Sequence, residues 1–390
     1  MSSNAQQIMT PEKLWQLGRV TPIGISKDGK SLIYKVGTPN VQENKINSKY
    51  FSVPVGGGKE TLLESIEGLV ADKNISKDGS KKLVDKAVKV EKLLGSDLYP
   101  ELSKTTAQVY ESLDYRHWDT WNDGTHNHVG YSENKKDAAF VDIMPNEPYD
   151  SPQKPHGGDE DYIWSPDGSK IIYVCKKKAG TAYATSTNTD LYEYDLATKT
   201  TKNLTEKNLG YDTHPSFSPQ GDLSWLQMKR DGFEADKNDI IVRFKGMDIN
   251  LTAAWDGTVD SFVWSNDGKK VYFIAPVLGT KQLFEVNFPG LTRIAVTVRQ
   301  LTDGDFDVNG IVGFTGTSVL VTKTTHNMAT EVFSYDLKAK FWKQITHVND
   351  EAYSKIAKCT SEKRWVTTTD GKKMLVWVIL PPNFDKTKKY

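Results

Sequence analysis

The densest group of polar and aromatic side chains lies in one segment, YRHWDTWNDGTHNH, residues 115–128. Arg116 and Asp119 are suited to binding charged termini or carboxylates, because a guanidinium can hold a carboxylate through two parallel hydrogen bonds. Trp118 and Trp121 would form an apolar wall beside them. The alternative is that Arg116 and Asp119 pair with each other or cap strands, which would make them structural.

A second charged segment is KRDGFEADKND, residues 229–239. An acidic loop of this kind could anchor a free amino group, and we take Arg230 and Glu234 as its candidate binding residues. The alternative is a solvated turn, since Asp-rich loops are common at turns. Calcium binding is not expected because the D-x-D-x-D-G spacing is missing.

Neither the histidines nor the cysteines form a recognisable metal site. His126 and His128 would lie on the same face of a strand, with His117 upstream, but no fourth ligand follows at a familiar spacing. Cys175 lies in an apolar strand and reads as a buried thiol, with a disulfide to Cys359 as the alternative. No cofactor is predicted.

Composition excludes several classes of partner. Lys plus Arg and Asp plus Glu are 50 each, so the basic excess typical of nucleic-acid binding is missing and no nucleic acid is expected. No apolar run is long enough to predict a membrane-spanning helix, and the polar start MSSNAQQ has no signal-peptide core.

A repeated turn indicates the elements that would carry these residues. WSPDGSKIIYV, starting at Trp164, places a Pro-Asp-Gly turn between two apolar strands. Related turns recur along the chain, and their glycines, spaced by 50, 89, 53, 47 and 48 residues, are Gly29, Gly79, Gly168, Gly221, Gly268 and Gly316.

The later copies are each followed by a second hairpin, such as LYEYDLATKTTKNLT from Leu191. Four short strands in about 48 residues match one blade of a β-propeller. We therefore predict an all-β fold, a β-propeller of six or seven four-stranded blades. The spacing of 89 predicts an insertion at about 85–125 in blade two, or else a hidden seventh blade with WNDG at Trp121 as its turn.

The predicted organisation has three parts. Residues 1–19 form an extension with a short helix, for which Thr10 is the N-cap and Pro11 the first helical residue. Residues 20–350 form the propeller. Residues 351–390, which close with LPPNFDKTKKY, break the blade pattern and are predicted to begin a connection to another domain.

The turn series, YRHWDTWNDG, MKRDGFEADKNDI and the closing LPPNFDKTKKY together resemble the N-terminal propeller of bacterial dipeptidyl- or acylaminoacyl-peptidases of the prolyl oligopeptidase family. The resemblance implies a propeller that gates access of short peptides to an α/β-hydrolase domain of the same full-length chain, and a periplasmic or secreted location. It also implies that a propeller glutamate, here Glu234, holds the peptide amino group.

The nucleophile of that family would lie in the hydrolase domain. No G-x-S-x-G motif occurs in the 390 residues, so no catalytic residue is predicted and we expect this chain to be inactive alone. The alternative function is a non-enzymatic, protein-binding propeller similar to TolB, which shares the SPDG turn. A propeller glycosidase is the least favoured of the three functional hypotheses.

Overall fold

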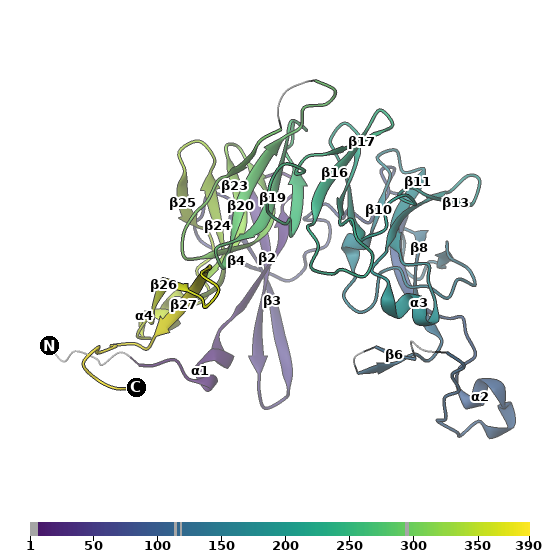
Figure 1. Cartoon of the computed structure of the whole chain (residues 1–390), viewed down its shortest axis with the longest axis horizontal. Helices are drawn as coiled ribbons and strands as arrows, with labels where there is room; N and C mark the ends of the chain where they lie inside the picture. Colours follow the sequence, from purple (N-terminus) through teal and green to yellow (C-terminus); the bar gives the residue numbers. More distant parts are fainter. Residues whose placement is uncertain (1–6, 113–114, 118, 293–295) are drawn as a thin grey trace.

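The computed structural model describes residues 7–112, 115–117, 119–292 and 296–390. Figure 1 shows six β-sheets arranged as the blades of a propeller, with the helices and both chain ends on its lower side. Five blades are complete four-stranded antiparallel sheets, each in sequential strand order. The predicted all-β propeller is confirmed, and it has six blades rather than seven.

The strands of the five complete blades follow the chain. They are β1 (Arg19–Ile25), β2 (Ser31–Asn40), β3 (Lys45–Pro54) and β4 (Thr61–Leu63); β10 (Tyr162–Trp164), β11 (Lys170–Cys175), β12 (Asp190–Asp195) and β13 (Thr200–Asn203); β14 (Asp212–Phe217), β15 (Leu223–Gln227), β16 (Asp239–Phe244) and β17 (Met247–Asn250); β18 (Ser261–Trp264), β19 (Lys270–Val277), β20 (Thr280–Asn287) and β21 (Val298–Gln300); and β22 (Asp307–Thr315), β23 (Ser318–Thr325), β24 (Met328–Asp336) and β25 (Phe341–Gln344).

Blade two departs from this pattern. It contains β5 (Lys81–Lys89), β8 (Thr125–Glu133) and β9 (Val141–Asp142), and its innermost strand is reduced to one bridge between Ile75 and Lys82. The WNDG sequence does not begin a further blade. Its Gly124, at φ +83°, instead leads into β8, which pairs with β5 from Lys89↔Thr125 to Lys81↔Glu133.

The recurring turn has one conformation throughout. All six turn glycines have positive φ, between 56° and 95°, as the left-handed corner of such a turn requires. In the WSPDG copy the Ser165 hydroxyl donates to Asp167 at 2.6 Å and accepts the Lys170 N–H at 2.9 Å. The hydrogen bonds that Asp167 accepts, first from the Ser165 hydroxyl and then from the N–H and hydroxyl of Ser169, lower its pKa to about 2.

A second repeated feature closes blades three to six. A buried threonine follows each outer strand, and its hydroxyl accepts a backbone N–H from a residue of the third strand. The same hydroxyl donates to the polar side chain of the residue that precedes this N–H donor. The threonines are Thr205, Thr252, Thr302 and Thr346, and the side chains that accept are Asp190, Asp239, Gln282 and Glu331. The third and fourth strands are thereby fastened together inside each blade.

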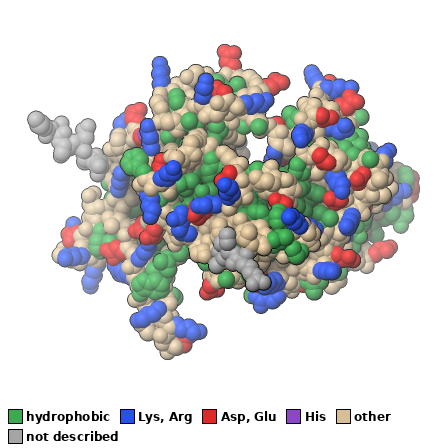
Figure 2. Space-filling view, turned by 90° about the horizontal axis from the view of Figure 1, so that it is seen from above, with side chains coloured by type: hydrophobic (Ala, Val, Ile, Leu, Met, Phe, Trp, Pro, Cys, Tyr) green, Lys and Arg blue, Asp and Glu red, His purple; other side chains and the backbone are tan. Residues whose placement is uncertain are grey.

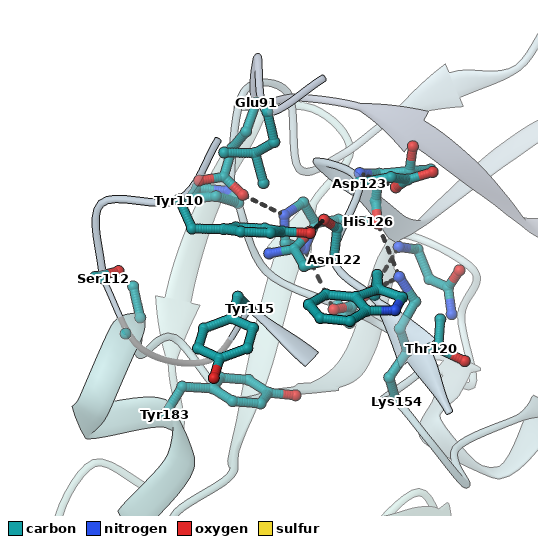
Figure 3. Close-up of a pocket in the computed structure, with 18 of the residues that line it drawn as sticks. Glu91, Tyr110, Ser112, Tyr115, Thr120, Asn122, Asp123, His126, Lys154 and Tyr183 are labelled. Atoms are coloured by element: carbon teal, nitrogen blue, oxygen red, sulfur yellow. Dashed lines mark hydrogen bonds and ion pairs between the residues drawn. The ribbon is translucent and has the colours of Figure 1, made fainter. Parts of the chain in front are cut away.

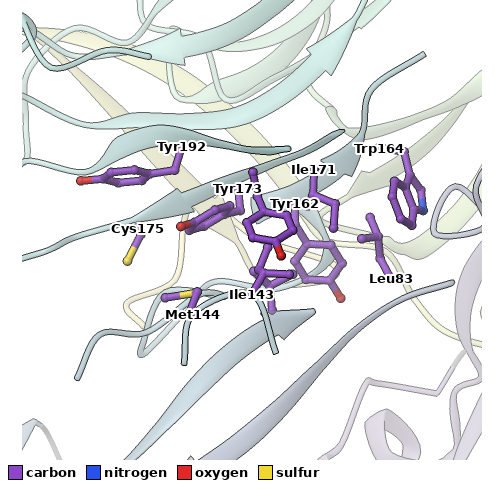
Figure 4. Close-up of a cluster of buried hydrophobic side chains, with 11 residues drawn as sticks. Leu83, Ile143, Met144, Tyr162, Trp164, Ile171, Tyr173, Cys175 and Tyr192 are labelled. Atoms are coloured by element: carbon purple, nitrogen blue, oxygen red, sulfur yellow. The ribbon is translucent and has the colours of Figure 1, made fainter. Parts of the chain in front are cut away.

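Each blade buries both faces, because alternate residues of a strand point to opposite neighbours. In β11, Ile171 and Tyr173 pack toward blade two (Figure 4), whereas Ile172 packs toward blade four. Five hydrophobic clusters of described residues fill the seams between blades two and three, three and four, four and five, five and six, and six and one.

None of these five clusters joins blade one to blade two. The described contact there is made by the connecting chain, where Val70 bridges Ser26 and the Lys27 N–H donates to the Leu69 carbonyl at 2.9 Å. Among the described residues, the first seam therefore lacks the hydrophobic cluster that each of the other five seams contains.

Seen from above, the molecule carries interspersed acidic and basic side chains, and an opening passes through it (Figure 2).

The remaining elements lie outside the blades. They are α1 (Pro11–Gln16), α2 (Gly95–Leu98), η1 (Pro100–Leu102), η2 (Asp159–Asp161), α3 (Gly180–Thr185), α4 (Asp350–Ser354), the short hairpin β6 (Arg116–His117) and β7 (Thr120–Trp121), and the hairpin β26 (Thr360–Thr367) and β27 (Lys373–Leu380). Thr10 caps α1 by accepting the Lys13 N–H at 3.4 Å. Among described residues, each helix is too short to cross a lipid bilayer. Cys175 and Cys359 are free thiols.

Candidate functional site

The segment between β5 and β8, residues 90–124, leaves the propeller as an arm that carries α2, η1 and the β6–β7 hairpin. The two ends of the arm are tied together, because the Gly124 carbonyl accepts the N–H groups of Val90 and Glu91 at 2.9 and 3.1 Å. A Cβ at Gly124 would lie 2.2 Å from the Glu91 carbonyl oxygen, so only glycine permits this approach. The base of the arm is consequently fixed.

A cavity of about 550 Å³ lies between this arm, the chain around residues 148–155, and the start of α3. One side is aromatic: the rings of Tyr110, Tyr115 and Trp121 are 5.5–6.2 Å apart, and Trp121 is nearly parallel to both tyrosines. Tyr183 of α3 lies near Tyr115 in Figure 3. The volume suits a small ligand.

A histidine between two carboxylates lies in the wall of the cavity (Figure 3). His126 Nε2 is 2.9 Å from Glu91 Oε2, and its Nδ1 is 3.2 Å from Asp150 Oδ2. Burial alone lowers the pKa of His126, but the hydrogen bonds to Asp150 and Glu91 outweigh it and raise that pKa. Burial acts to raise the pKa of Asp150, yet His126, the Asn127 N–H and Lys154 together lower it.

The charged lining is mostly acidic. Five carboxylates and two ammonium groups line the cavity, and they are Glu91, Glu111, Asp119, Asp123, Asp150, Lys154 and Lys178. Lys154 is bound to the carboxylate of Asp150 at 3.1 Å and to the Thr125 carbonyl at 2.8 Å, which leaves less of its charge for a ligand. The cavity is therefore suited to a cation that also has an apolar surface.

The structure brings part of the predicted site together. Asp119 and Trp121 line the cavity, and the Arg116 guanidinium lies over the Trp121 ring at 5.7 Å, where it supports the aromatic side. The carboxylate of Asp119 accepts the Thr120 hydroxyl at 3.3 Å. Trp118 lies outside the described residues.

Arg230 and Glu234 do not line this cavity. Arg230 pairs with Asp236 at 2.8 Å and stacks on Phe233 at 4.0 Å. Asp231, the residue after Arg230, accepts hydrogen bonds from the Ser186 hydroxyl at 2.6 Å and from the Thr187 N–H at 2.8 Å. Ser186 and Thr187 directly follow α3. The loop of residues 229–239 thus supports the helix that carries Tyr183.

His126 and His128, considered above as metal ligands, use both ring nitrogens in other contacts. His128 is fully buried and contacts Asp142 and the Glu147 carbonyl, both at 2.8 Å. Sequence reasoning missed the cavity residues Glu91, Tyr110 and Asp150. Asp150 lies in PYDSPQKP, whose prolines signal a loop, but nothing local indicates that this loop returns to β8.

Several known proteins are similar to this chain in sequence. The dipeptidyl-peptidases 5 of Porphyromonas gingivalis and Porphyromonas endodontalis are each 32% identical to the chain over 441 and 436 aligned positions, which include 100% of the chain. The chain is similar in sequence to these dipeptidyl-peptidases 5 over its whole length. A dipeptidyl-peptidase 5 of Aspergillus fumigatus is 28% identical over 312 positions, or 73% of the chain. No family model matches the sequence.

The chain spans 63% and 62% of the length of the two Porphyromonas relatives and 42% of the length of the Aspergillus relative. Two structures of Pyrococcus horikoshii acylaminoacyl peptidase share its fold, with TM-scores of 0.66 and 0.65 at 13% and 15% identity. They cover 94% and 95% of the chain, which covers 59% of each. The predicted resemblance to a prolyl oligopeptidase-family propeller is confirmed.

Proposed function

We propose that this chain is the substrate-binding propeller of a serine exopeptidase that removes dipeptides from short peptides, and that the cavity receives the free amino end of the peptide. The observation that carries this proposal is an acidic cavity with a stacked aromatic side on the arm of blade two. The names of the homologous proteins support the reaction class.

The chemistry of the cavity fits a peptide amino terminus. An ammonium group is attracted by carboxylates and by the faces of aromatic rings, and Asp119 and Glu91 line the same cavity as Tyr115 and Trp121. The first side chains of the peptide would pack on the rings. Contacts of this kind hold the substrate in one orientation, which accelerates a reaction only where a reactive group is correctly placed.

We further propose that an α/β-hydrolase domain of the full-length chain covers the lower side of the propeller and that the propeller restricts access to it. The hairpin β26–β27 supports this, because an isolated two-stranded sheet is marginally stable and has two unpaired edges. Its exposed apolar residues are Trp365, Val366, Met374 and Ile379. In Figure 1 this hairpin and the arm lie on the same side. Family resemblance alone supports the periplasmic or secreted location.

Calorimetry with the chain tests the binding proposal. We expect alanyl-leucine amide to bind, its N-acetylated form to bind at least tenfold more weakly, and Asp119→Asn to weaken binding of the free amine by about tenfold. Asp137→Asn is the matched control, because Asp137 is exposed and does not line the cavity. Equal binding of the acetylated and free forms would overturn the proposal.

A further inference from the structure

The environment of His126 requires a charged ring. Both ring nitrogens face a carboxylate oxygen, at 2.9 Å for Glu91 and 3.2 Å for Asp150. A neutral imidazole has one N–H and one lone pair, so only the imidazolium can donate to both. The residue is 8% exposed and lies in the wall of the cavity. Loss of the proton must therefore break one of the two contacts.

The two carboxylates are not held equally. Asp150 is buried, and its Oδ1 accepts the Asn127 N–H at 2.7 Å and pairs with Lys154 at 3.1 Å. The Glu91 side chain is 39% exposed, and within the described part of the chain its carboxylate pairs with His126 alone. A neutral His126 would keep donating to Asp150, and its Nε2 lone pair would then repel Glu91.

The backbone limits what can move. The backbone N–H groups of Val90 and Glu91 both donate to the Gly124 carbonyl, and Gly124 lies close to the Glu91 backbone. The backbone at the base of the arm therefore has no room to shift. The Glu91 side chain borders the cavity. Once released, its carboxylate turns while the arm stays in place.

We propose that His126 is a proton-controlled positioning residue: as imidazolium it holds the Glu91 carboxylate against itself, and as neutral imidazole it releases that carboxylate to bind a cation in the cavity. This regulation rests on the proposed function. The groups that face His126 are Glu91 and Asp150, and Lys154 pairs with Asp150 from behind. The other charged groups of the cavity contribute the same electrostatic field whether His126 is protonated or neutral; they are Glu111, Asp119, Asp123 and Lys178.

The direction of the pH dependence follows. The pKa of His126 is raised above its ordinary 6.5, so the imidazolium predominates at and below that pH. As pH rises through the folded pKa, the cavity loses one positive charge and gains a free carboxylate. Affinity for a cation accordingly rises with pH, the opposite of what loss of a ligand's own ammonium proton would cause.

Phenyltrimethylammonium is the probe, because its charge does not titrate and its ring suits the aromatic side of the cavity. For the 390-residue chain we expect its affinity to rise about fivefold between pH 6 and pH 9, since one unpaired carboxylate is added near the cation. Glu91→Gln should bind more weakly and show a smaller rise, because His126 still loses its charge but no carboxylate is released. His126→Gln should bind tightly and independently of pH. His347→Gln, at an exposed histidine paired with Asp350, should keep the rise. A pH-independent affinity of the unaltered chain would overturn the proposal.

A second measurement needs no ligand. In NMR titrations of the imidazole carbons, Glu91→Gln should lower the pKa of His126 by at least half a unit, because one of its two carboxylate partners is lost. An unchanged pKa would overturn the proposal even if His126→Gln fails to fold. Failure of every cation to bind, together with the expected change in the His126 titration, would instead reject the proposed function of the cavity and leave the proton-dependent contact established.

Discussion

The Thr252 hydroxyl donates to Asp239 at 2.6 Å and accepts the N–H of Ile240, the next residue, at 3.1 Å. Thr252 is fully buried. One side chain thus satisfies a buried carboxylate and a buried backbone donor, and it joins the third and fourth strands of blade four. The same arrangement recurs in blades three, five and six.

Replacing this hydroxyl should reveal its contribution to stability. Thr252→Val keeps the shape of the side chain but leaves a backbone donor unpaired and Asp239 with one partner fewer, so we expect a loss of about 1–3 kcal/mol in the free energy of unfolding. Urea denaturation measures it. Thr21→Val, at an exposed position of β1, should change it by less than about 0.5 kcal/mol. Equal losses at the two sites would contradict this account.

Asp161 should make stability depend on pH. It is 4% exposed, and burial raises its pKa from 3.8 to about 7, although the Gln153 N–H opposes the change. The folded chain therefore binds a proton between about pH 4 and pH 7 that the unfolded chain has released, and this contribution to stability is lost as pH rises. The Asp161→Asn variant has no carboxyl group here and should not lose this stability as pH rises.

Denaturation at several pH values tests this. From pH 4 to pH 8 the stability of Asp161→Asn relative to the unaltered chain should improve by roughly 3 kcal/mol, the equivalent of a shift of about two to three pKa units. Asp137→Asn, at an exposed aspartate, should show no such trend. A stability difference that stays constant with pH would mean that Asp161 remains ionised.

The seam between blades one and two should open first. The described hydrophobic clusters fill the other five seams, and the connecting chain at residues 69–70 makes the backbone contact here. Regions with few buried apolar contacts exchange their amide hydrogens sooner. We expect residues 64–72 to exchange at least tenfold faster than the corresponding connection, residues 204–211. Similar protection of the two connections would contradict this.

The chain by itself should show no peptidase activity, since it contains no G-x-S-x-G motif. Incubation with dipeptidyl and acylaminoacyl chromogenic substrates is the assay. Turnover that persists through repurification would disprove the expectation.

When the chain is joined to an α/β-hydrolase domain, Asp119→Ala and Arg116→Ala should raise KM for peptides more than they change the melting temperature. Asp119 lines the cavity, and Arg116 supports the Trp121 ring. Contacts to the ends of a substrate act chiefly on binding. A lower melting temperature with unchanged KM would show that the two residues are structural.

The sequence by itself determined the blade repeat. Each Pro-Asp-Gly or related turn acts locally, because Gly168 and its counterparts supply the left-handed corner and the serine and aspartate close the turn through their own side chains. Strands rich in β-branched and aromatic residues follow at a constant spacing. The number of blades remained open because the inner strand of blade two is reduced to one bridge at Ile75.

Only the tertiary structure decided the site. Glu91, His126 and Asp150 are separated by 35 and 24 positions, and they meet because the pairing of β5 with β8 closes the base of the arm while the loop before blade three returns to β8. The register places His126 opposite Val88, three residues before Glu91. Arg230 and Glu234 share the composition of a binding loop, yet Asp231 fastens that loop to the residues after α3. Residue type is a local property, whereas convergence on a cavity depends on long-range pairing, which no segment of the sequence encodes alone.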